Sequence, residues 1–306
     1  MANAITIRNF RWKDTDSIVN FLNITRCLTN TPSEESSTLF TQRLKMPGTN
    51  PVADCFIAES NGNLTGYIQV IYEDSLSRAV GIQTVSKTTD KGEIYKLLND
   101  VGIKHSIEKS ASLYHVQVND HDIEFIKILQ SDGFRHVKSY CNLLWEADFL
   151  TRLELPQGSS LRSFQRDKDE ALLTNLQNTS FYNSWGFSPN TVEEIQARVR
   201  MERCEDSGII FIEDRGKTAG YNWTLSQKTA GSSLGWISMT GVDPKYRGRK
   251  LGKAIVLAGM HYLKAQEISQ IALEVDSDNV VAVNLYNQLG FKTVGRTLWF
   301  EKNLDG

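Results

Sequence analysis

The sequence predicts an α+β protein in which two similar copies of a strand-and-helix unit follow one another. Short strand-like runs alternate with helical spacings of apolar residues, and paired motifs recur at a nearly constant separation along the 306 residues. One Pro/Gly/Ser-rich stretch lies near the midpoint, at residues 155–160. We therefore predict two domains, over residues 1–152 and 159–306.

The first half of each copy consists of a short strand, a helix and a hairpin. Residues 7–10 and 161–164 are the two opening strands, and residues 56–67 and 210–221 are the two hairpins. Asn-Gly at the centre of the first hairpin is a strong turn signal. The Gly-Tyr pairs that close these hairpins lie at 66–67 and 220–221, an offset of 154.

The second half of each copy repeats at an offset of 157 without gaps. Val85 corresponds to Val242, and the Gly-Phe pair at 133–134 corresponds to the pair at 290–291. A constant offset over this distance is typical of a tandem repeat.

Composition argues against several classes of protein. With 40% hydrophobic residues, 23% charged residues and a net charge of -2, the chain is typical of a globular protein without a nucleic-acid or membrane-surface partner. No apolar run approaches the roughly 20 residues that span a bilayer. The amino terminus enters a strand pattern directly, so we expect a cytoplasmic protein. Neither cysteines nor histidines have ligand spacing, so we expect free thiols and no metal; they are Cys27, Cys55, Cys141, Cys204, His105, His115, His121, His136 and His261.

A basic, glycine-containing turn joins a strand at 235–241 to a helix whose apolar residues recur at helical spacing from Leu251 to Tyr262. A helix amino terminus presents unpaired N–H groups and a positive dipole, which bind phosphate. Glycines allow the backbone to approach a ligand closely. The alternative is an ordinary basic surface turn. The residues concerned are Arg247, Gly248, Arg249, Lys250, Leu251, Gly252 and Lys253.

The first copy differs at this turn. Asp90 and Glu93 place negative charge where a phosphate would lie, and Tyr95 occupies the position of Gly252. We predict that the first copy has lost its phosphate site.

A second helix follows the strand at 271–275. Asn279, Ala282, Val283 and Tyr286 share one of its faces, and Gly290 ends it. A polar Asn and a Tyr on this face can line a pocket beside the phosphate turn. The alternative is that Asn279 only caps the helix and Tyr286 only packs.

These residues resemble the acetyl-CoA-binding core of the GNAT acetyltransferase superfamily. The resemblance rests on Val-x-Pro-x-x-Arg-Gly-x-x-Leu-Gly at 242–252 and Asn-x-x-Ala-x-x-Leu-Tyr-x-x-x-Gly-Phe at 279–291. It covers the second copy and extends to the first through the repeat. It implies two GNAT-like domains, each a mixed, mostly antiparallel sheet flanked by helices, in a tandem arrangement similar to that of the mycothiol synthase family.

The resemblance also implies roles for individual residues, with acetyl-CoA as the acyl donor. Backbone amides from Arg247 to Gly252 would hold the pyrophosphate, and Lys253 would also contact the cofactor. Lys250 stands where the family usually has glycine; we expect a helical-turn conformation there, which tolerates the change. Asn279 would face the pantetheine, and Tyr286 would protonate the leaving thiolate. Asp122 and Leu129 replace these two in the first copy, which should be inactive. The strand residues that would pair with the pantetheine are Thr240, Gly241 and Val242.

The implied reaction is direct attack of a small-molecule primary amine on the thioester in a ternary complex. It needs a base, for which Glu274 and Asp276 are candidates; each is equally explained as a solvated or capping carboxylate. Alternatives are a non-catalytic coenzyme A-binding or scaffold protein, and an enzyme with a longer acyl donor or a hydroxyl acceptor. The oligomeric state stays open.

The acceptor would lie against an aromatic and polar segment at 181–191. The alternative is that its aromatic residues pack between the two copies. The candidate acceptor-binding residues are Tyr182, Asn183, Trp185 and Phe187.

Overall fold

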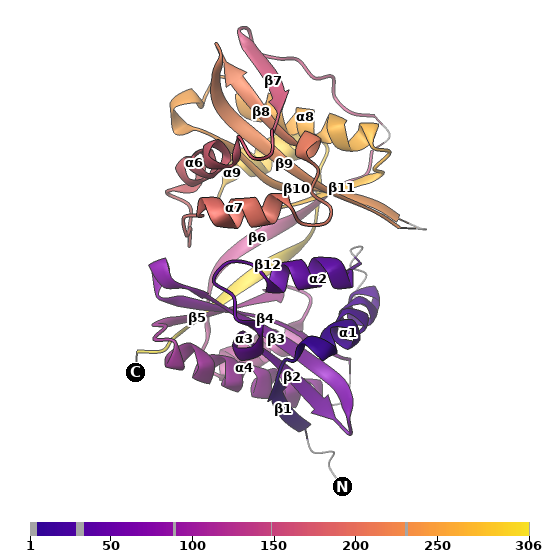
Figure 1. Ribbon diagram of the computed structural model, residues 1–306, viewed down its shortest axis with the longest axis vertical. Helices are drawn as coiled ribbons and strands as arrows, with labels where there is room; N and C mark the ends of the chain where they lie inside the picture. Colours follow the sequence, from indigo (N-terminus) through magenta and orange to yellow (C-terminus); the bar gives the residue numbers. More distant parts are fainter. Residues whose placement is uncertain (1–4, 29–33, 88–89, 148, 230–231, 306) are drawn as a thin grey trace. The chain divides into compact units, whose positions relative to one another are not determined.

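The computed structural model describes residues 5–28, 34–87, 90–147, 149–229 and 232–305. It divides into two compact units (Figure 1). The first unit contains Met1–Ser139 and Gly295–Gly306, and the second contains Tyr140–Val294.

The first unit is a mixed sheet with helices, in the strand order β1-β2-β3-β4-β5-β12. Strands β4 and β5 run parallel, and the other neighbouring pairs run antiparallel. Its elements are β1 (Ile5–Asn9), α1 (Thr15–Leu28), α2 (Ser37–Leu44), α3 (Pro51–Asp54), β2 (Cys55–Ser60), β3 (Asn63–Glu73), β4 (Arg78–Val85), α4 (Lys91–Glu108), β5 (Leu113–Asn119), α5 (Ile123–Ser131) and most of β12 (Lys292–Asn303).

The second unit repeats this plan in the order β6-β11-β10-β9-β8-β7, with β10 and β11 as the parallel pair. The predicted mixed, mostly antiparallel sheet flanked by helices is therefore confirmed. Its elements are the part of β6 (Arg135–Trp145) from Tyr140 onward, β7 (Ser159–Ser163), α6 (Glu170–Phe181), α7 (Val192–Val199), β8 (Ile209–Asp214), β9 (Lys217–Thr229), β10 (Ser232–Val242), α8 (Leu251–Ala265), β11 (Gln270–Asp276) and α9 (Val280–Gln288).

The units and the sequence copies differ by one strand each. Strand β6 ends the first copy but pairs with β11 in the second unit, whereas β12 ends the second copy and pairs with β5 in the first unit. The division into domains at 1–152 and 159–306 thus remains a prediction about the repeat in the sequence. In space, the last strand of each copy completes the other copy's sheet.

The repeat extends to details of the backbone. At the tip of the β2–β3 hairpin, Asn61 and Gly62 have φ values of 51° and 77°. At the tip of the β8–β9 hairpin, Arg215 and Gly216 have φ values of 52° and 74°. Positive φ at both central positions is the geometry that two-residue hairpins favour, so both predicted hairpins are confirmed.

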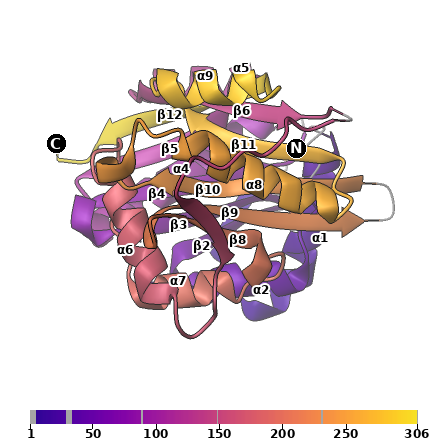
Figure 2. The ribbon, with the colours of Figure 1, turned by 90° about the horizontal axis from the view of Figure 1, so that it is seen from above.

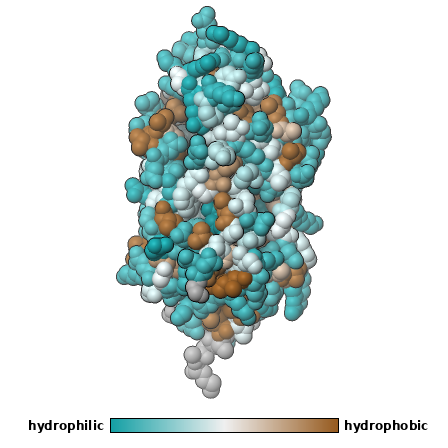
Figure 3. Space-filling view, turned by 90° about the vertical axis from the view of Figure 1, so that its left-hand side faces the viewer, coloured by the Kyte–Doolittle hydropathy of each residue, from teal (hydrophilic) through white to brown (hydrophobic). Residues whose placement is uncertain are grey.

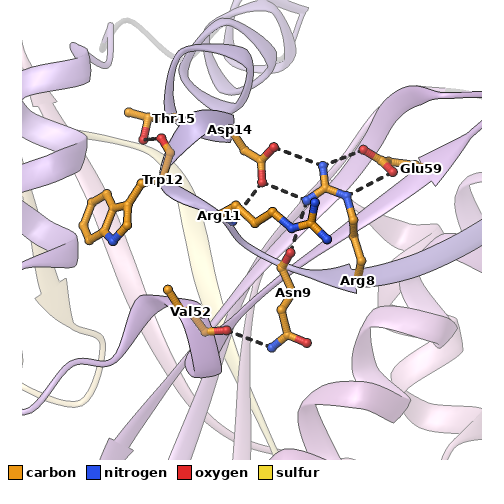
Figure 4. A network of polar contacts seen from close by, with 8 residues as sticks. All are labelled: Arg8, Asn9, Arg11, Trp12, Asp14, Thr15, Val52 and Glu59. Atoms are coloured by element: carbon orange, nitrogen blue, oxygen red, sulfur yellow. Dashed lines mark hydrogen bonds and ion pairs between the residues drawn. The ribbon is translucent and has the colours of Figure 1, made fainter.

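An arginine on the first strand of each unit anchors the chain that follows it. In the first unit Arg8 contacts both Asp14 and Glu59, at 2.8 and 2.7 Å (Figure 4). In the second unit Arg162 contacts Asp169 at 2.7 Å and Glu213 at 3.1 Å. The same cluster in both copies is direct structural evidence for the repeat.

These contacts shift the ionisation of the aspartates. Hydrogen bonds from Arg8 lower the pKa of Asp14 below its usual value. Partial burial raises the pKa of Asp169, but the hydrogen bonds from Arg162 and from the Gln165 backbone N–H, together with the nearby positive charges, outweigh burial and the net pKa is lowered. Both carboxylates therefore stay ionised and keep the start of each copy in place.

Helices cover both faces of the sheet in the second unit. Leu251, Ala254 and Ile255 of α8 pack against alternate residues of β8. Leu173 and Leu176 of α6 pack on the opposite face, together with α7 and the residues of β8 and β9 that point that way. Figure 2 shows α8 on one side of these strands and α7 on the other. The amphipathic pattern predicted for 251–262 is thus confirmed.

Polar side chains dominate the face of the protein in Figure 3, where apolar residues form only small, separate groups. Within the described residues, no helix is long and apolar enough to cross a membrane. Cys55, Cys141 and Cys204 are buried free thiols, as expected, while the Cys27 side chain lies outside the described part of the structure.

Candidate active site

The predicted phosphate turn leaves open space in front of the first turn of α8. Gly248 has a φ of 80°, and a Cβ atom added there would meet nothing within 4 Å. A Cβ added at Gly252 would meet only Val242, at 4.0 Å. No side chain caps α8 within the described structure. Its first N–H groups are therefore available to an anion.

Lys250 departs from our expectation. It has a φ of 63° and a ψ of 7°, which is the left-handed conformation and not the expected helical turn. Residues other than glycine pay roughly 1–2 kcal/mol for this conformation, because the Cβ atom approaches the following carbonyl. The turn therefore keeps the backbone path that glycine favours and stores strain at Lys250.

The charged side chains of the turn differ in their contacts: the two arginines have protein partners, and the two lysines are exposed. Arg247 donates to the carbonyl oxygens of Val242, at 3.1 Å, and of Ser180, at 2.8 Å, and so ties the end of α6 to the end of β10. Arg249 is paired with Asp214. Lys250 and Lys253 are exposed, whereas Leu251 is a core residue that offers a ligand only its backbone. Backbone amides and the two lysines are therefore the groups of this turn that are open to an anion.

Strands β10 and β11 pair only over a short stretch. Their ladder runs from Leu234, opposite Gln270, to Trp236, opposite Ala272, although β10 continues to Val242. The register against β9 shifts between Ile237 and Met239, which marks a bulge at Ser238. Within the described strands, the edge of β10 beyond Trp236 thus has no ladder partner on its β11 side, where an extended ligand can pair with it.

Side chains of the predicted pantetheine strand are already engaged. The Thr240 hydroxyl donates to the carbonyl oxygen of Tyr221 at 3.0 Å. A Cβ atom at Gly241 would lie 2.7 Å from that of Ser180 and 2.9 Å from the Tyr221 ring. The absence of a side chain at Gly241 therefore lets α6 and β9 approach this strand, and the strand offers a ligand its backbone.

Helix α9 follows β11; Asn279 caps its amino terminus, and Tyr286 packs in the core that α8 and β11 share. Asn279 accepts a hydrogen bond from the N–H of Ala282 at 3.1 Å, so its capping role is confirmed. Tyr286 is 5% exposed and packs edge-on against Phe291. Its hydroxyl makes no hydrogen bond with the residues the structure describes. Burial raises its pKa to about 12, so the phenol carries a proton at neutral pH.

A pocket of about 390 Å³ lies between the end of α6 and the turn after β10. Tyr182, Asn183 and Phe187 are among its lining residues, so the structure brings together three of the four predicted acceptor residues. Trp185 is not among them. Tyr182 is 77% exposed, which shows that it is not a core residue. The other lining residues are Asn178, Thr179, Pro189 and Pro244.

A buried polar group beside this pocket was not predicted from the sequence. Gln177, Ser180 and Tyr221 each bury a side-chain oxygen that has no hydrogen-bond partner of good geometry among the described residues. Burial, and then the nearby Tyr286 phenol, raise the pKa of Tyr221. Other buried polar atoms of the described residues, such as the Tyr114 hydroxyl, also have no hydrogen-bond partner, so only its place beside the pocket singles this group out. The only sequence signal was the repeated Gly-Tyr pair, which the first copy also carries.

The candidate bases lie on β11. Leu273 and Val275 point into the core with α8 and α9, so Glu274 and Asp276 point to the opposite face of the sheet. Glu274 is exposed and lies two residues beyond the last pair of the β10–β11 ladder. This position is beside the opening between the strands.

The first unit fills the corresponding space with side chains. The Tyr95 ring stacks on Phe125 with centroids 3.9 Å apart, and its hydroxyl donates to Asp122 at 2.7 Å. Lys91 reaches the same carboxylate at 2.9 Å. Leu129, at the position of Tyr286, is fully buried.

Known proteins resemble this chain in sequence. The model of the acetyltransferase (GNAT) family matches residues 171–291. A mycothiol acetyltransferase of Thermobispora bispora is 33% identical over 141 residues, which are 45% of this chain and 48% of that protein. The chain thus spans about half the length of that relative. A mycothiol acetyltransferase of Stackebrandtia nassauensis is 28% identical over 248 residues, 79% of each chain.

Solved structures resemble it in fold along nearly the whole chain. A GCN5-related N-acetyltransferase from Sphaerobacter thermophilus superposes with a TM-score of 0.77 at 18% identity, covering 98% of this chain and 96% of that one. A tandem GNAT protein from the clavulanic acid biosynthesis pathway gives 0.75 at 15% identity, covering 99% of each chain. Residues 171–291 therefore match the GNAT family, and the chain as a whole has the tandem GNAT fold and resembles the mycothiol acetyltransferases in sequence.

Proposed function

We propose that the second unit transfers an acetyl group from acetyl-CoA to a primary amine of a small molecule. One observation carries this proposal: the second unit has an open helix amino terminus, a strand edge without a ladder partner among the described strands, and a buried protonated phenol. Side chains fill the corresponding place in the first unit. The mycothiol acetyltransferase relatives support acetyl transfer, and we carry over no substrate from them.

In this proposal, acetyl-CoA enters as a substrate along the open edge of β10. Backbone N–H groups between Arg247 and Gly252 hold its pyrophosphate, assisted by Lys250 and Lys253. The pantetheine pairs with the backbone from Thr240 to Val242 as an added strand. An amide of the same strand stabilises the negative charge that develops on the acetyl oxygen.

The acceptor occupies the pocket beside Tyr182 and attacks the thioester directly. Its nitrogen forms a bond to the acetyl carbon, and the carbon–sulfur bond breaks. Glu274 accepts the proton that the nitrogen loses, and Tyr286 donates its proton to the departing thiolate. Solvent returns the proton from Glu274 to Tyr286. The products are an acetamide and coenzyme A with its thiol.

Calorimetric titration with acetyl-CoA, together with a free-thiol assay over a panel of amines, tests the proposal. We expect one acetyl-CoA bound per chain and thiol release that depends on an amine. Binding of acetyl-CoA without thiol release would favour the coenzyme A-binding or scaffold alternative, provided that amines, alcohols and longer acyl donors have all been tried. No binding would rule out the site at the Arg247 turn.

A further inference from the structure

The strand exchange brings a residue of the first copy beside the working site. Strand β6 pairs antiparallel with β11, and Asn142 lies directly opposite Glu274. The domains predicted over 1–152 and 159–306 separate these two residues, which lie on either side of the midpoint of the chain. Both belong to the second compact unit.

Asn142 and Glu274 point to the same face of the sheet. Cys141 and Leu143, the neighbours of Asn142, are buried with Leu273 and Val275 against α8 and α9. Because side chains alternate along a strand, Asn142 and Glu274 both point away from those helices. That is the face on which α6 and Tyr221 pack, and the pocket lies at the end of α6.

Asn142 and Glu274 also lie at the level of the strands where the β10–β11 ladder ends and the proposed site begins. The β10–β11 ladder ends at Trp236 and Ala272, and Glu274 is the next residue of β11 that points to the face on which α6 packs. Residues directly opposite in an antiparallel pair have Cβ atoms about 4.5–5.5 Å apart, which is within reach of an amide and a carboxylate. An exposed Glu side chain has several rotamers, and an amide donor beside it favours one orientation of the carboxylate.

The first unit offers an internal comparison. At the repeat offset of 157, Glu274 corresponds to Gln117 and Asn142 corresponds to Trp299. Gln117 and Trp299 are also directly opposite one another, in the β5–β12 ladder. The same geometry thus carries a carboxylate and an amide only in the unit whose phosphate turn is open.

We propose that Asn142 is a positioning residue that orients the Glu274 carboxylate toward the attacking amine. This inference rests on the proposed function and assigns the first sequence copy a direct part in it. The first copy has lost its own site, but its last strand completes the acceptor side of the other.

Steady-state kinetics of Asn142→Leu, Glu274→Gln and the double variant test this role. We expect Asn142→Leu to lower kcat about 10-fold and to leave KM for acetyl-CoA within about twofold, because the residue acts on the base and not on donor binding. Glu274→Gln should lower kcat by about 100-fold or more. If Asn142 acts through Glu274, the double variant should be no slower than Glu274→Gln alone.

Two further variants separate positioning from folding. Asn142→Asp is nearly isosteric but replaces the amide donor with a like charge, so it should fold and still lose activity. Tyr140→Phe is a matched control on the same strand and face, and should retain activity. Calorimetric binding of acetyl-CoA shows that each variant is folded.

Unchanged kcat in both Asn142 variants, or independent multiplicative losses in the double variant, would overturn the positioning role while acetyl transfer by the wild type stands. An inactive wild type would overturn the proposed function, and this inference with it.

Discussion

The amino-terminal turns of α4 and α8 occupy corresponding places in the two units, yet one is closed and the other is open. Helix α4 begins at Lys91, whereas α8 begins at Leu251, which corresponds to Ile94. The first helix is therefore three residues longer at this end. The segment that forms the basic turn in the second unit is wound into helix in the first.

Two glycines account for much of the difference. Lys91 corresponds to Gly248 and Tyr95 to Gly252, and both first-unit side chains reach Asp122 at the start of α5. Asn279 stands at the start of α9 instead and caps that helix without such partners from α8 in the described structure. In the first unit, side chains that bridge the two helix ends thus close this turn without changing the fold.

The largest effect should come from copying the closed turn into the open one. Gly252→Tyr adds a ring where acetyl-CoA would lie, so we expect at least about a 100-fold loss of affinity, about 2.7 kcal/mol. Isothermal titration measures it. Ala265→Tyr, at the exposed far end of α8, is the matched control and should bind normally. Retained affinity in Gly252→Tyr would place the donor elsewhere.

A smaller but specific effect should follow from removing the phenol that distinguishes Tyr286 from Leu129. Tyr286→Phe should lower turnover about 100-fold and leave acetyl-CoA affinity nearly unchanged, because the acid acts on the leaving thiolate. Tyr262→Phe is the control on α8: it removes a phenol that hydrogen-bonds the Ser207 hydroxyl, and it should retain turnover. Equal rates in the wild type and Tyr286→Phe would remove Tyr286 from this role.

The same phenol predicts the alkaline limb of the pH profile. Its pKa is raised to about 12, so the acid form is present below that value and is lost as the pH rises through it. We expect no fall in kcat from Tyr286 between about pH 7 and pH 10, where an ordinary tyrosine begins to ionise. A break in kcat in this range that disappears in Tyr286→Phe would contradict the buried, protonated state.

The two helix caps should separate stability from binding. Asp122→Ala removes a helix cap and the partner of Lys91 and Tyr95. We therefore expect the free energy of unfolding to fall by about 2 kcal/mol, with acetyl-CoA affinity unchanged. Asn279→Ala should cost about 1 kcal/mol and also weaken acetyl-CoA binding a few-fold. Scanning calorimetry and titration measure the two quantities. Asn287→Ala, exposed on α9, is the control; a loss of affinity in Asp122→Ala would refute the separation.

The smallest effect should come from relieving the strain in the open turn. Lys250→Gly suits the left-handed backbone and should stabilise the second unit by about 0.5–1 kcal/mol. Lys253→Gly, inside the first turn of α8, should instead destabilise it by about 1 kcal/mol. Thermal unfolding compares them. A lower melting temperature for Lys250→Gly would show that the lysine side chain contributes more than its conformation costs.

Much of the site was predictable because its signals are local. The glycines at 248 and 252 and the helix faces carrying Asn279 and Tyr286 follow from residues a few positions apart, and the structure has these elements as predicted. Lys250 was mispredicted because its side chain suits a helix, whereas the turn requires a positive φ. Local preference was overridden there by the path that the chain must follow between β10 and α8.

Other features depended on pairing between distant segments. Ser180 and Tyr221 meet at Gly241 only because α6 packs across β9 and β10, and no spacing along the chain encodes that contact. Their burial without partners of good geometry became visible only once the neighbouring atoms were known.

The sequence by itself determined the repeat, several elements of each copy and the different residues of the two turns, because periodicity and glycine positions act within one element. Only the tertiary structure decided that β6 pairs with β11 and β12 with β5. Alternating side chains show that a segment is a strand, but either sheet edge can supply the backbone hydrogen bonds it needs. The choice of partner placed Asn142 opposite Glu274, and it rests on contacts between residues more than a hundred positions apart.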